Sequence, residues 1–517
     1  MLNRKQANTI AVCFLMLLIA VSLSAKKTIE IISFNDSHGR IHEDTSLKGK
    51  DVGMAKFAAV VKDKVKNCKG DAIVVSAGDN YQGSAITALT KGTPVSDMMK
   101  EINVSASAVG NHEFDWGIGY FKRWQKDGGF PFLAANIINK KTNKTPEWAR
   151  PYLIVERSGV KVAFIGLTTI ETPFLTSKEN IENLEFIDPS KAAQQWIDFL
   201  NSGKDKAGKP DIIVALTHIA SYQDKTDGKI TGKEINDLCN KTKGLNAVIS
   251  GHGHKVVCGY INNIPVVQAY CHCRALGILK VVFNDKNKLE KITPAIIEIY
   301  KNKDKLQEDI NMTKIYNKYL SQMKKLDKPI GRAAGNFFKN EENNTISDIG
   351  AWVTKAMMNQ TSSQIAVVNS GGIRTGLNSG DITISDMYAL IPFDNAIVTM
   401  KLSGKALKRV IEYCLDGPGE FYGINVYYDS SAAKGNRIVS MTLFDGRSIE
   451  MNEDYRVATL DFVINGGDKF DFSGARDIKE TQDILRDLLI KKVKENKVIY
   501  SVKADYLVNI IDQQNAA

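Results

Sequence analysis

This chain of 517 residues has no internal repeat, no long low-complexity segment and no dense block of basic residues. The first two absences exclude a solenoid and a largely disordered chain. Its 68 Lys and Arg are interspersed with 58 Asp and Glu, so the charge pattern does not indicate a nucleic-acid polymer as partner. The formal net charge of +10 would favour small anionic ligands only slightly. The remaining composition is that of a globular protein long enough for two or three domains.

The first 24 residues differ from the rest of the chain in composition. Arg4 and Lys5 precede an apolar run at 10–21, and Ser22-Leu23-Ser24 offers the small residues that a cleavage site requires. The pattern predicts a secretory signal peptide at 1–24, because the run is too short for a stable membrane span. An uncleaved anchor is the alternative. We therefore expect a mature chain without a membrane span, secreted or periplasmic according to the organism.

Cysteine is also scarce, and an even number remains after the predicted signal peptide. The remaining cysteines are Cys68, Cys239, Cys258, Cys271, Cys273 and Cys414. Disulfides are permitted in an exported protein, but their pairing cannot be read from the sequence. Cys258 with Cys271-His272-Cys273 suggests a structural zinc site as an alternative, although the C-x-x-C spacing of such sites is absent.

Short apolar segments alternate with amphipathic ones from residue 28 to about 299. This alternation is typical of an α/β domain with sheet inside and helices outside. Strands are expected at 29–33, 72–76, 106–109, 162–166, 212–216, 247–250 and 265–268, helices at 53–66 and 190–200, and a strand meander at 277–283 and 292–299.

The Lys-rich, nearly glycine-free segment 301–328 favours a helix that ends near Pro329 and leads to a second domain. This second domain again mixes helices and strands. Helices are expected at 347–358 and 404–414, and strands at 364–368, 395–401 and 455–460. The predicted division is a signal peptide at 1–24, a catalytic domain at 25–300, a linker helix at 301–329 and a substrate-binding domain at 330–517.

Histidine occurs only seven times, and five of the seven lie in short segments rich in Gly, Asn or Asp. The segments are 35–38, 110–113, 217–218 and 251–254, and 78–80 is an acidic segment of the same kind. Asp36, Asp79 and His218 each follow an apolar, β-branched run that reads as a strand. Because residues just past the ends of buried strands meet at one edge of a sheet, we expect these side chains to lie together.

These segments contain the ligands that two adjacent divalent ions need: one bridging carboxylate, further ligands for each ion and an open position for water. Asp36 and His38 can reach one ion together, and Asp79 suits the bridge. Imidazole, carboxylate and amide oxygen together favour Zn, Mn or Co over Mg or Ca. The seven candidate ligands are Asp36, His38, Asp79, Asn111, His218, His252 and His254.

The order of these motifs resembles the calcineurin-like metallophosphoesterase superfamily. Within it, the chain is similar to the secreted 5′-nucleotidase / UDP-sugar hydrolase family over nearly its whole mature length. The resemblance implies an α/β fold with two domains: an N-terminal four-layer α/β/β/α metallophosphoesterase sandwich and a mixed α/β nucleotide-binding C-terminal domain, joined by a helix. It also implies that the C-terminal domain closes on the metal site by rotating about this helix.

The resemblance assigns roles to the metal-site residues. One ion would take Asp36, His38, Asp79 and His254, and the other Asp79, Asn111, His218 and His252. His112 would stabilise the transition state or protonate the leaving group, with Asp115 orienting its ring. Many nucleotidases carry Gln or Asn where this chain has His254, which loosens the assignment within the superfamily. His42 and His272 fall outside the pattern and are expected to be structural.

Three segments of the second domain carry residues suited to a nucleotide. In 369–374 a Gly-Gly turn displays Arg374, whose guanidinium can grip a phosphate. Phe393 and Phe462 could sandwich a flat base, or could instead be core residues. By resemblance, the substrate-binding residues are Asn369, Arg374, Phe393, Asn395, Phe462 and Asp468. The family's further phosphate-binding arginines are missing near 336–340, where Lys339 is the available cation.

The sequence therefore predicts a secreted phosphohydrolase that removes phosphate from nucleotides by attack of a hydroxide held between two metal ions. The missing arginine keeps nucleoside diphosphate sugars, dinucleotides and 2′,3′-cyclic nucleotides open as substrates. A thiosulfohydrolase-like enzyme and a secreted binding protein with a decayed site are the alternatives. The Phe393/Phe462 pair with Asp468 argues against the first, and the complete ligand set argues against the second. The oligomeric state is not predicted.

Overall fold

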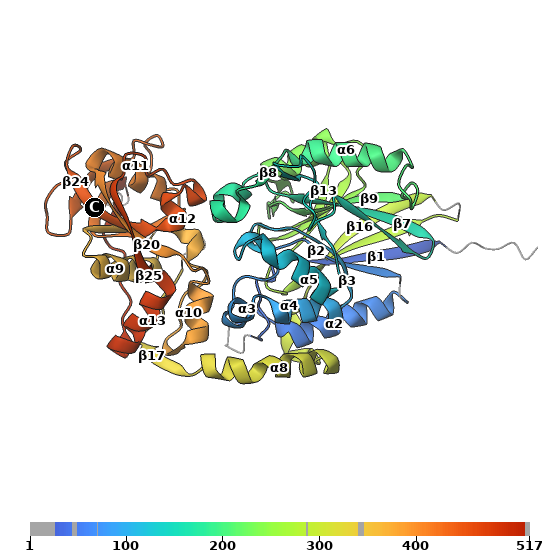
Figure 1. Cartoon of the computed structure of the whole chain (residues 1–517), viewed down its shortest axis with the longest axis horizontal. Helices are drawn as coiled ribbons and strands as arrows, with labels where there is room; N and C mark the ends of the chain where they lie inside the picture. Colours follow the sequence, from blue (N-terminus) through green and yellow to red (C-terminus); the bar gives the residue numbers. More distant parts are fainter. Residues whose placement is uncertain (1–25, 44–48, 70, 286–287, 340–345, 512–517) are drawn as a thin grey trace, which may run out of the picture.

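The computed structural model describes residues 26–43, 49–69, 71–285, 288–339 and 346–511. The predicted signal peptide lies outside these described residues. Two bodies stand beside each other and are joined along one side by helix α8 (Figure 1). None of the helices in the described ranges is long and apolar enough to cross a membrane.

The first body contains two six-stranded sheets, in the order β16-β15-β1-β2-β3-β4 and β13-β14-β12-β9-β7-β6. Their strands are β1 (Lys27–Phe34), β2 (Ala72–Ser76), β3 (Val104–Ala108), β4 (Phe132–Leu133), β6 (Tyr152–Arg157), β7 (Val160–Thr168), β9 (Ile212–His218), β12 (Ala247–Ser250), β13 (Val256–Ile261), β14 (Ile264–Ala269), β15 (Ala275–Phe283) and β16 (Leu289–Glu298). Strands β1 to β4 are mutually parallel, as are β7, β9, β12 and β14. Their carboxyl ends therefore meet at one edge of each sheet.

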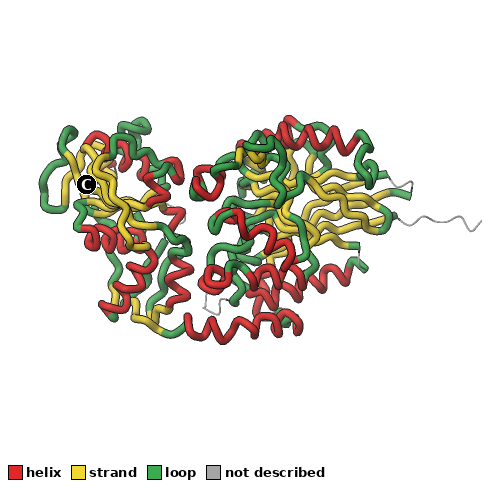
Figure 2. The backbone as a smooth tube through the Cα atoms, viewed as in Figure 1, coloured by secondary structure: helices red, strands yellow, loops and turns green. Residues whose placement is uncertain are grey.

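Alternate residues of the buried strands serve two different cores. Ile31 and Ile73 pack with Val214 between the two sheets, whereas Ile32 and Val74 pack under the outer helices. Figure 2 shows the sheets enclosed by helices. The helices are α2 (Gly53–Asn67), α3 (Ala85–Thr90), α4 (Thr93–Glu101) and α5 (Phe121–Gly128) on one side, and α6 (Pro189–Asn201) and α7 (Lys233–Lys241) on the other. The predicted four-layer α/β/β/α sandwich is confirmed. Two small ribbons complete this body, β5 (Ile137–Asn139) with β8 (Leu184–Phe186), and β10 (Tyr222–Gln223) with β11 (Ile230–Thr231).

The prediction of one continuous helix over 301–328 is wrong at its beginning. A short 3-10 segment, Ile299–Lys305, is followed by extended backbone, and α8 (Ile310–Leu326) starts afresh. The reason is local, because the side chain of Asp309 accepts a hydrogen bond from the backbone N–H of Met312 and caps a new helix. The composition of the segment favoured a helix throughout, but it did not show that a new helix begins after Asp309.

Helix α8 belongs to the packing of the first body. Met312 and Met323 are buried among the hydrophobic side chains of the first body. The Tyr319 hydroxyl donates to Asp97 at 2.6 Å. Helix α8 also contacts α10 (Ile384–Leu390) of the second body. The helix that joins the two bodies is thus fixed to the first body by its buried side chains.

The second body is built on a five-stranded sheet, β21-β18-β24-β20-β25, beside two three-stranded sheets, β19-β17-β26 and β23-β22-β27. The strands are β17 (Pro329–Ala333), β18 (Ile365–Asn369), β19 (Gly380–Thr383), β20 (Ala396–Ser403), β21 (Gly419–Tyr422), β22 (Ile424–Tyr428), β23 (Ile438–Leu443), β24 (Asp454–Leu460), β25 (Arg476–Ile484), β26 (Val498–Ile499) and β27 (Leu507–Asn509). The helices are α9 (Asp348–Thr361), α10 (Ile384–Leu390), α11 (Gly404–Cys414), α12 (Asp461–Ile464) and α13 (Leu485–Asn496). One hydrophobic core spans these elements, and the predicted mixed α/β domain is confirmed.

A buried acid links α9 to this sheet. Glu420, only 4% exposed, accepts hydrogen bonds from the backbone N–H and the hydroxyl of Ser347, the N-cap of α9. A Cβ at Gly350 would lie 2.2 Å from the carboxyl carbon of Glu420, so the helix can approach only because this residue is glycine. Burial, only partly offset by the Ser347 hydrogen bonds, raises the pKa of Glu420 to about 7.

We expect the second body to lose stability as the pH rises through about 7, because the folded state holds the Glu420 proton more tightly than the unfolded chain. The stability is fully present below the ordinary pKa of 4.5 and is lost above the folded value, a change of about 3 kcal/mol. Thermal unfolding of wild type and Glu420→Gln between about pH 5 and pH 8 measures this effect. The glutamine mimics the protonated acid, so the variant should show a weaker pH dependence; equal slopes would contradict the prediction.

Candidate active site

Residues that follow β1, β2 and β12 adopt left-handed backbone conformations. φ is 50° at Asp36, 48° at His38, 55° at Asp79, 72° at His252 and 49° at His254. Residues other than glycine seldom adopt positive φ, and such strain concentrates at functional sites. Five of the seven predicted metal ligands thus occupy backbone conformations that the fold must enforce.

The first group of ligand atoms consists of Asp36, His38 and His254. Asp36 Oδ1 lies 3.2 Å from His254 Nε2, which lies 3.0 Å from His38 Nε2. One ligand atom from each of the three residues lies within 4.8 Å of the other two. Two ring nitrogens and a carboxylate oxygen therefore converge on one point.

The second group consists of Asp79, His218 and His252, again with ligand atoms within 4.8 Å of one another. Asp79 Oδ2 lies 3.0 Å from His218 Nε2 and 3.9 Å from His38 Nε2 of the first group. Asp79 is thus the carboxylate between the two groups. A side chain at Gly110 would collide with it, since a Cβ there would lie 2.1 Å from Asp79 Oδ1.

Backbone carbonyls determine how two of the histidines face these groups. His38 Nδ1 lies 3.0 Å from the carbonyl oxygen of Gln82, and His218 Nδ1 lies 2.7 Å from that of Ala77. A carbonyl only accepts, so Nδ1 carries the hydrogen in a neutral ring and Nε2 keeps its lone pair. Both lone pairs then point at the carboxylates, an arrangement that a cation would stabilise.

Buried polar atoms without a hydrogen-bond partner gather at this edge. They include Asp36 Oδ1, Asp79 Oδ2, Asn111 Oδ1 and His218 Nε2. Burial lowers the pKa of His218, but the charge of Asp79 outweighs it and raises this pKa to about 10, so the Asp79 carboxylate attracts a positive charge here, which a bound cation would supply in place of the proton. Burial lowers the pKa of His252 to about 3, which keeps that ring neutral. Because unpartnered buried polar atoms are costly, this set of oxygen and nitrogen donors fits divalent cations.

Glu113 is part of the site although the sequence pattern assigned it no role. Its carboxylate is fully buried and accepts backbone N–H groups from Asp79 at 2.9 Å, Asn80 at 2.7 Å and Gly110 at 2.6 Å. Burial and the charge of Asp79 raise the pKa of Glu113 to about 7, against these hydrogen bonds. One side chain thereby holds together the loops that carry Asp79 and Asn111. Its place in the segment 110–113 was the only signal in the sequence.

His112 and Asp115 form the predicted pair. His112 Nδ1 lies 2.8 Å from Asp115 Oδ2, and Thr176 donates to the other oxygen of that carboxylate at 3.3 Å. Burial lowers the pKa of His112, but Asp115 and Asp79 outweigh it and raise the value above the ordinary one. The ring can therefore carry a proton near neutral pH. The backbone N–H of His112 also donates to Asp79 Oδ1 at 2.9 Å, which places the pair beside the second group.

The second body contacts this edge through two of its predicted substrate-binding residues. The Phe393 ring stacks on His112 with centroids 5.4 Å apart, and Arg374 Nη2 lies 3.5 Å from His38 Nε2. Gln82 donates to the carbonyl of Pro392 at 3.0 Å, so the loops of the two bodies touch directly. The structure brings residues more than 300 positions apart into one site.

The other substrate-binding candidates lie nearby in the second body. Asn369 donates to Asp468 Oδ2 at 2.7 Å, while its own Oδ1 is buried without a partner. Burial raises the pKa of Asp468, although His112 and Arg374 lie close enough to oppose the shift. Phe462, on α12, is partly buried and packs against the core. The half-buried Asn395 follows the Phe393 loop just before β20.

Arg486 holds the loop that carries Phe393 by hydrogen bonds to its backbone. This residue, 5% exposed, donates from Nη1 to the carbonyl oxygens of Pro392 at 3.2 Å and Phe393 at 3.3 Å. It also pairs with Asp394, and its guanidinium lies 3.9 Å from the centre of the Tyr388 ring. The sequence pattern did not identify this residue, which lies nearly 100 positions from the loop.

Lys339, His42 and the cysteines of the described residues lie outside the two ligand groups. Lys339 lies near Glu420 and lowers the pKa of that acid, so its charge acts within the second body. His42 bonds to the Tyr316 hydroxyl at 2.9 Å. All six cysteines that follow the predicted signal peptide are free thiols. Of the alternative zinc ligands, Cys271 and His272 group with His254.

Comparisons with known proteins agree with both halves of the chain. Residues 29–256 match the calcineurin-like phosphoesterase family, and residues 329–474 match the 5′-nucleotidase C-terminal domain. The chain is 28% identical to endonuclease YhcR of Bacillus subtilis over 84% of its own length, but spans only 37% of that longer protein. It is 27% identical to protein UshA of Yersinia enterocolitica, covering 87% of this chain and 88% of the relative. The crystal structure of a 5′-nucleotidase precursor from Thermus thermophilus superposes with a TM-score of 0.80 at 23% identity, over 93% of this chain and 99% of that one.

Proposed function

Because this chain belongs to the 5′-nucleotidase family of calcineurin-like metallophosphoesterases, and is a metal-dependent phosphohydrolase of nucleotides, we propose that two divalent ions occupy its two ligand groups. One ion would take Asp36, His38, Asp79 and His254; the other would take Asp79, Asn111, His218 and His252. The observation that carries the proposal is the set of buried, unpartnered donor atoms directed into these groups. The mixed nitrogen and oxygen donors favour Zn, Mn or Co.

Bound ions of this kind would supply a Lewis acid and lower the pKa of water in the site. The chain's own residues would transfer the proton and bind the phosphate. His112 gives a proton to the leaving ester oxygen, and Asp115 holds its ring in the orientation that this transfer needs. Arg374 binds the phosphate by two parallel N–H bonds, beside His38.

We further propose that the second body selects the substrate. Phe393 and Phe462 would stack on the base, and Asp468 with Asn369 would bind the ribose hydroxyls. The partial burial of both rings supports this role, because each keeps surface free for a ligand. Lys339 acts on Glu420, which leaves Arg374 to bind the terminal phosphate. A site with a single such arginine suits a substrate with less terminal charge, which favours nucleoside diphosphate sugars and dinucleotides as further substrates beside the nucleoside 5′-monophosphates.

We propose 25–300 and 330–517 as the two domains and 301–329 as the segment that connects them, within which α8 covers Ile310–Leu326. We also propose export of the mature chain after removal of 1–24. Each has a direct measurement. The mass of the N-terminal peptide from protein recovered outside the cytoplasm would report cleavage, and limited proteolysis would report the boundaries.

Hydrolysis over a substrate panel tests the proposed function, with chromatography to identify the nucleotide products and an assay of released phosphate. The purified mature chain is assayed with Mn, Co or Zn on AMP, UMP, ATP, UDP-glucose, NAD, a 2′,3′-cyclic nucleotide and an aryl phosphate. Chelation should abolish hydrolysis and added metal should restore it. Phe462→Ala should weaken use of nucleotides about 5- to 150-fold, the equivalent of one stacked base, and leave the aryl phosphate unaffected. Equal loss on both substrates would refute the base clamp, and hydrolysis of the aryl phosphate alone would refute nucleotide specificity.

Arg486→Met should raise KM for nucleotides roughly tenfold with a smaller change in kcat. The buried carbonyls of Pro392 and Phe393 would lose their donor, and the loop that carries the Phe393 ring would no longer be held against the site. Arg437→Met is the matched control, since Arg437 is also buried and pairs at 2.8 Å with Glu412 of α11, outside the Phe393 loop. An increase in KM of the same size in both variants would show a general loss of stability instead.

A further inference from the structure

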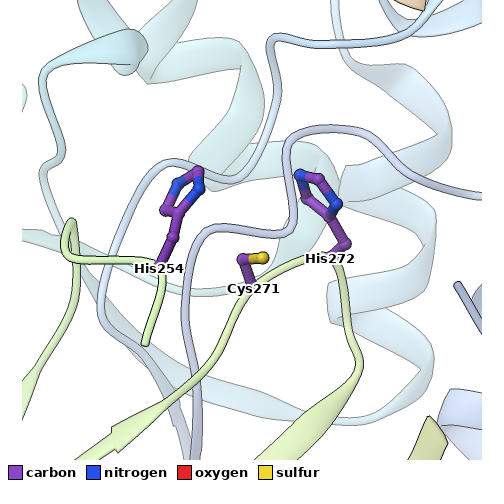
Figure 3. A group of neighbouring side chains, drawn as sticks. All are labelled: His254, Cys271 and His272. Atoms are coloured by element: carbon purple, nitrogen blue, oxygen red, sulfur yellow. The ribbon is translucent and has the colours of Figure 1, made fainter. Parts of the chain in front are cut away.

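Beside the first ligand group lie two side chains that the proposed function does not use, Cys271 and His272, and both lie close to His254. His254, Cys271 and His272 each place one nitrogen or sulfur within 4.8 Å of the other two. Figure 3 shows the Cys271 thiol between the two imidazole rings. Cys271 and His272 come from the turn between β14 and β15, and His254 from the loop after β12.

The turn that carries Cys271 and His272 is fastened to the metal site. The backbone N–H of His272 donates to the carbonyl of Asp36 at 2.7 Å, and φ is 55° at His272 and 56° at Cys273. His272 Nδ1 is buried without a hydrogen-bond partner. The two side chains are thus held in place, and one of them has an unused ligand atom.

The surroundings select against hard cations. Arg274 donates from Nε to Asp51 at 2.7 Å, and its Nη1 lies 3.9 Å from the sulfur of Cys271. Asp51 Oδ1 lies 3.7 Å from His272 Nδ1. The Asp51 carboxylate is therefore shared with an arginine and adds little to the attraction of Mg or Mn. A soft ion gains from its bonds to sulfur and imidazole instead.

We propose that His254, Cys271 and His272 form an accessory site for a soft cation such as Zn²⁺ or Cd²⁺, and that its occupation inhibits hydrolysis. The thiol proton leaves to solvent as the sulfur binds the ion, and both imidazoles bind through neutral nitrogen. A neutral imidazole has one nitrogen with a free lone pair. His254 therefore serves either this ion or the first ligand group, where it lies 3.2 Å from Asp36. The competition rests on the proposed role of His254 as a ligand in that group.

The exposure of these side chains is consistent with reversible binding of an ion from solvent. Cys271 is 3% exposed, whereas the side chain of His254 is 32% exposed. An ion from solvent would therefore meet His254 first. Excess zinc should therefore inhibit the enzyme that a lower concentration activates.

Cadmium titration of the reduced, Mn-loaded protein tests this site with two readouts. The ultraviolet charge-transfer band of a cadmium thiolate reports binding, and phosphate release reports inhibition. In wild type both should change together and saturate at one equivalent. Cys271→Ser should abolish the band and raise the inhibitory Cd²⁺ concentration about 10- to 100-fold. Cys273→Ser, which changes a buried neighbouring thiol outside the group, should keep both responses.

Each other outcome contradicts a defined part of the proposal. A band that is absent from wild type, or that survives in Cys271→Ser, overturns the site. A band without inhibition overturns the competition for His254. Should Cys271→Ser fail to fold, His272→Gln removes a different ligand and must also weaken the cadmium response. The absorbance does not depend on hydrolysis, so failure of the proposed function would be distinguished from failure of this site.

Discussion

Replacing His112 with alanine should lower kcat by about 10²–10⁴-fold and leave the bound metal content unchanged. His112 is bonded to Asp115 at 2.8 Å but belongs to neither ligand group, so its loss removes a proton donor without removing a metal ligand. Steady-state kinetics with metal analysis of the same preparation measure both quantities. A kcat within threefold of wild type, or a variant depleted in metal, would contradict the assignment.

The pH dependence of kcat gives a second view of the same pair. Asp115 raises the pKa of His112, so the protonated ring is kept to higher pH and activity falls on the alkaline side as that proton is lost. Asp115→Asn keeps the imidazole but removes the charge that supports its protonation. The alkaline limb of the profile should therefore move to lower pH in this variant. An unmoved limb would show that His112 does not supply the proton.

Glu113→Gln should weaken metal binding about 10- to 100-fold although Glu113 offers no ligand to either group. The carboxylate accepts N–H groups from Asp79, Asn80 and Gly110, and an amide supplies only one oxygen for them. At least one buried N–H would be left facing another donor, at a cost of about 1–3 kcal/mol. The loop that positions Asp79 would shift as a result.

Metal titration followed by restored hydrolysis measures this affinity. Glu420→Gln is the control, because it also neutralises a buried glutamate, but one that lies in the second body and is bonded to Ser347 at the start of α9. Only Glu113→Gln should require more metal. Equal metal affinity in the two variants would show that the Glu113 carboxylate does not hold the Asp79 loop in position.

The fold class and most elements could be predicted because they depend on local patterns. The β-branched runs before Asp36, Asp79 and His218 mark buried strands, and these strands are β1, β2 and β9. The linker helix was predicted only in part, because one capping residue, Asp309, restarts the helix inside a segment of uniform helix propensity. The composition of a segment does not reveal where a single capping hydrogen bond starts a helix.

The amino-acid sequence by itself determined which chemistry this protein carries: seven donor side chains of the right types, each beside a strand end, and a second half suited to a nucleotide. Tertiary structure alone decided what surrounds them. The His252 backbone reaches Asp36 across 216 residues, Glu113 braces two loops, Arg486 supports the Phe393 loop, and Cys271 lies beside His254. These contacts depend on strand order and on the docking of two bodies, which no local pattern encodes, because a side chain's neighbours across a sheet edge come from distant parts of the chain.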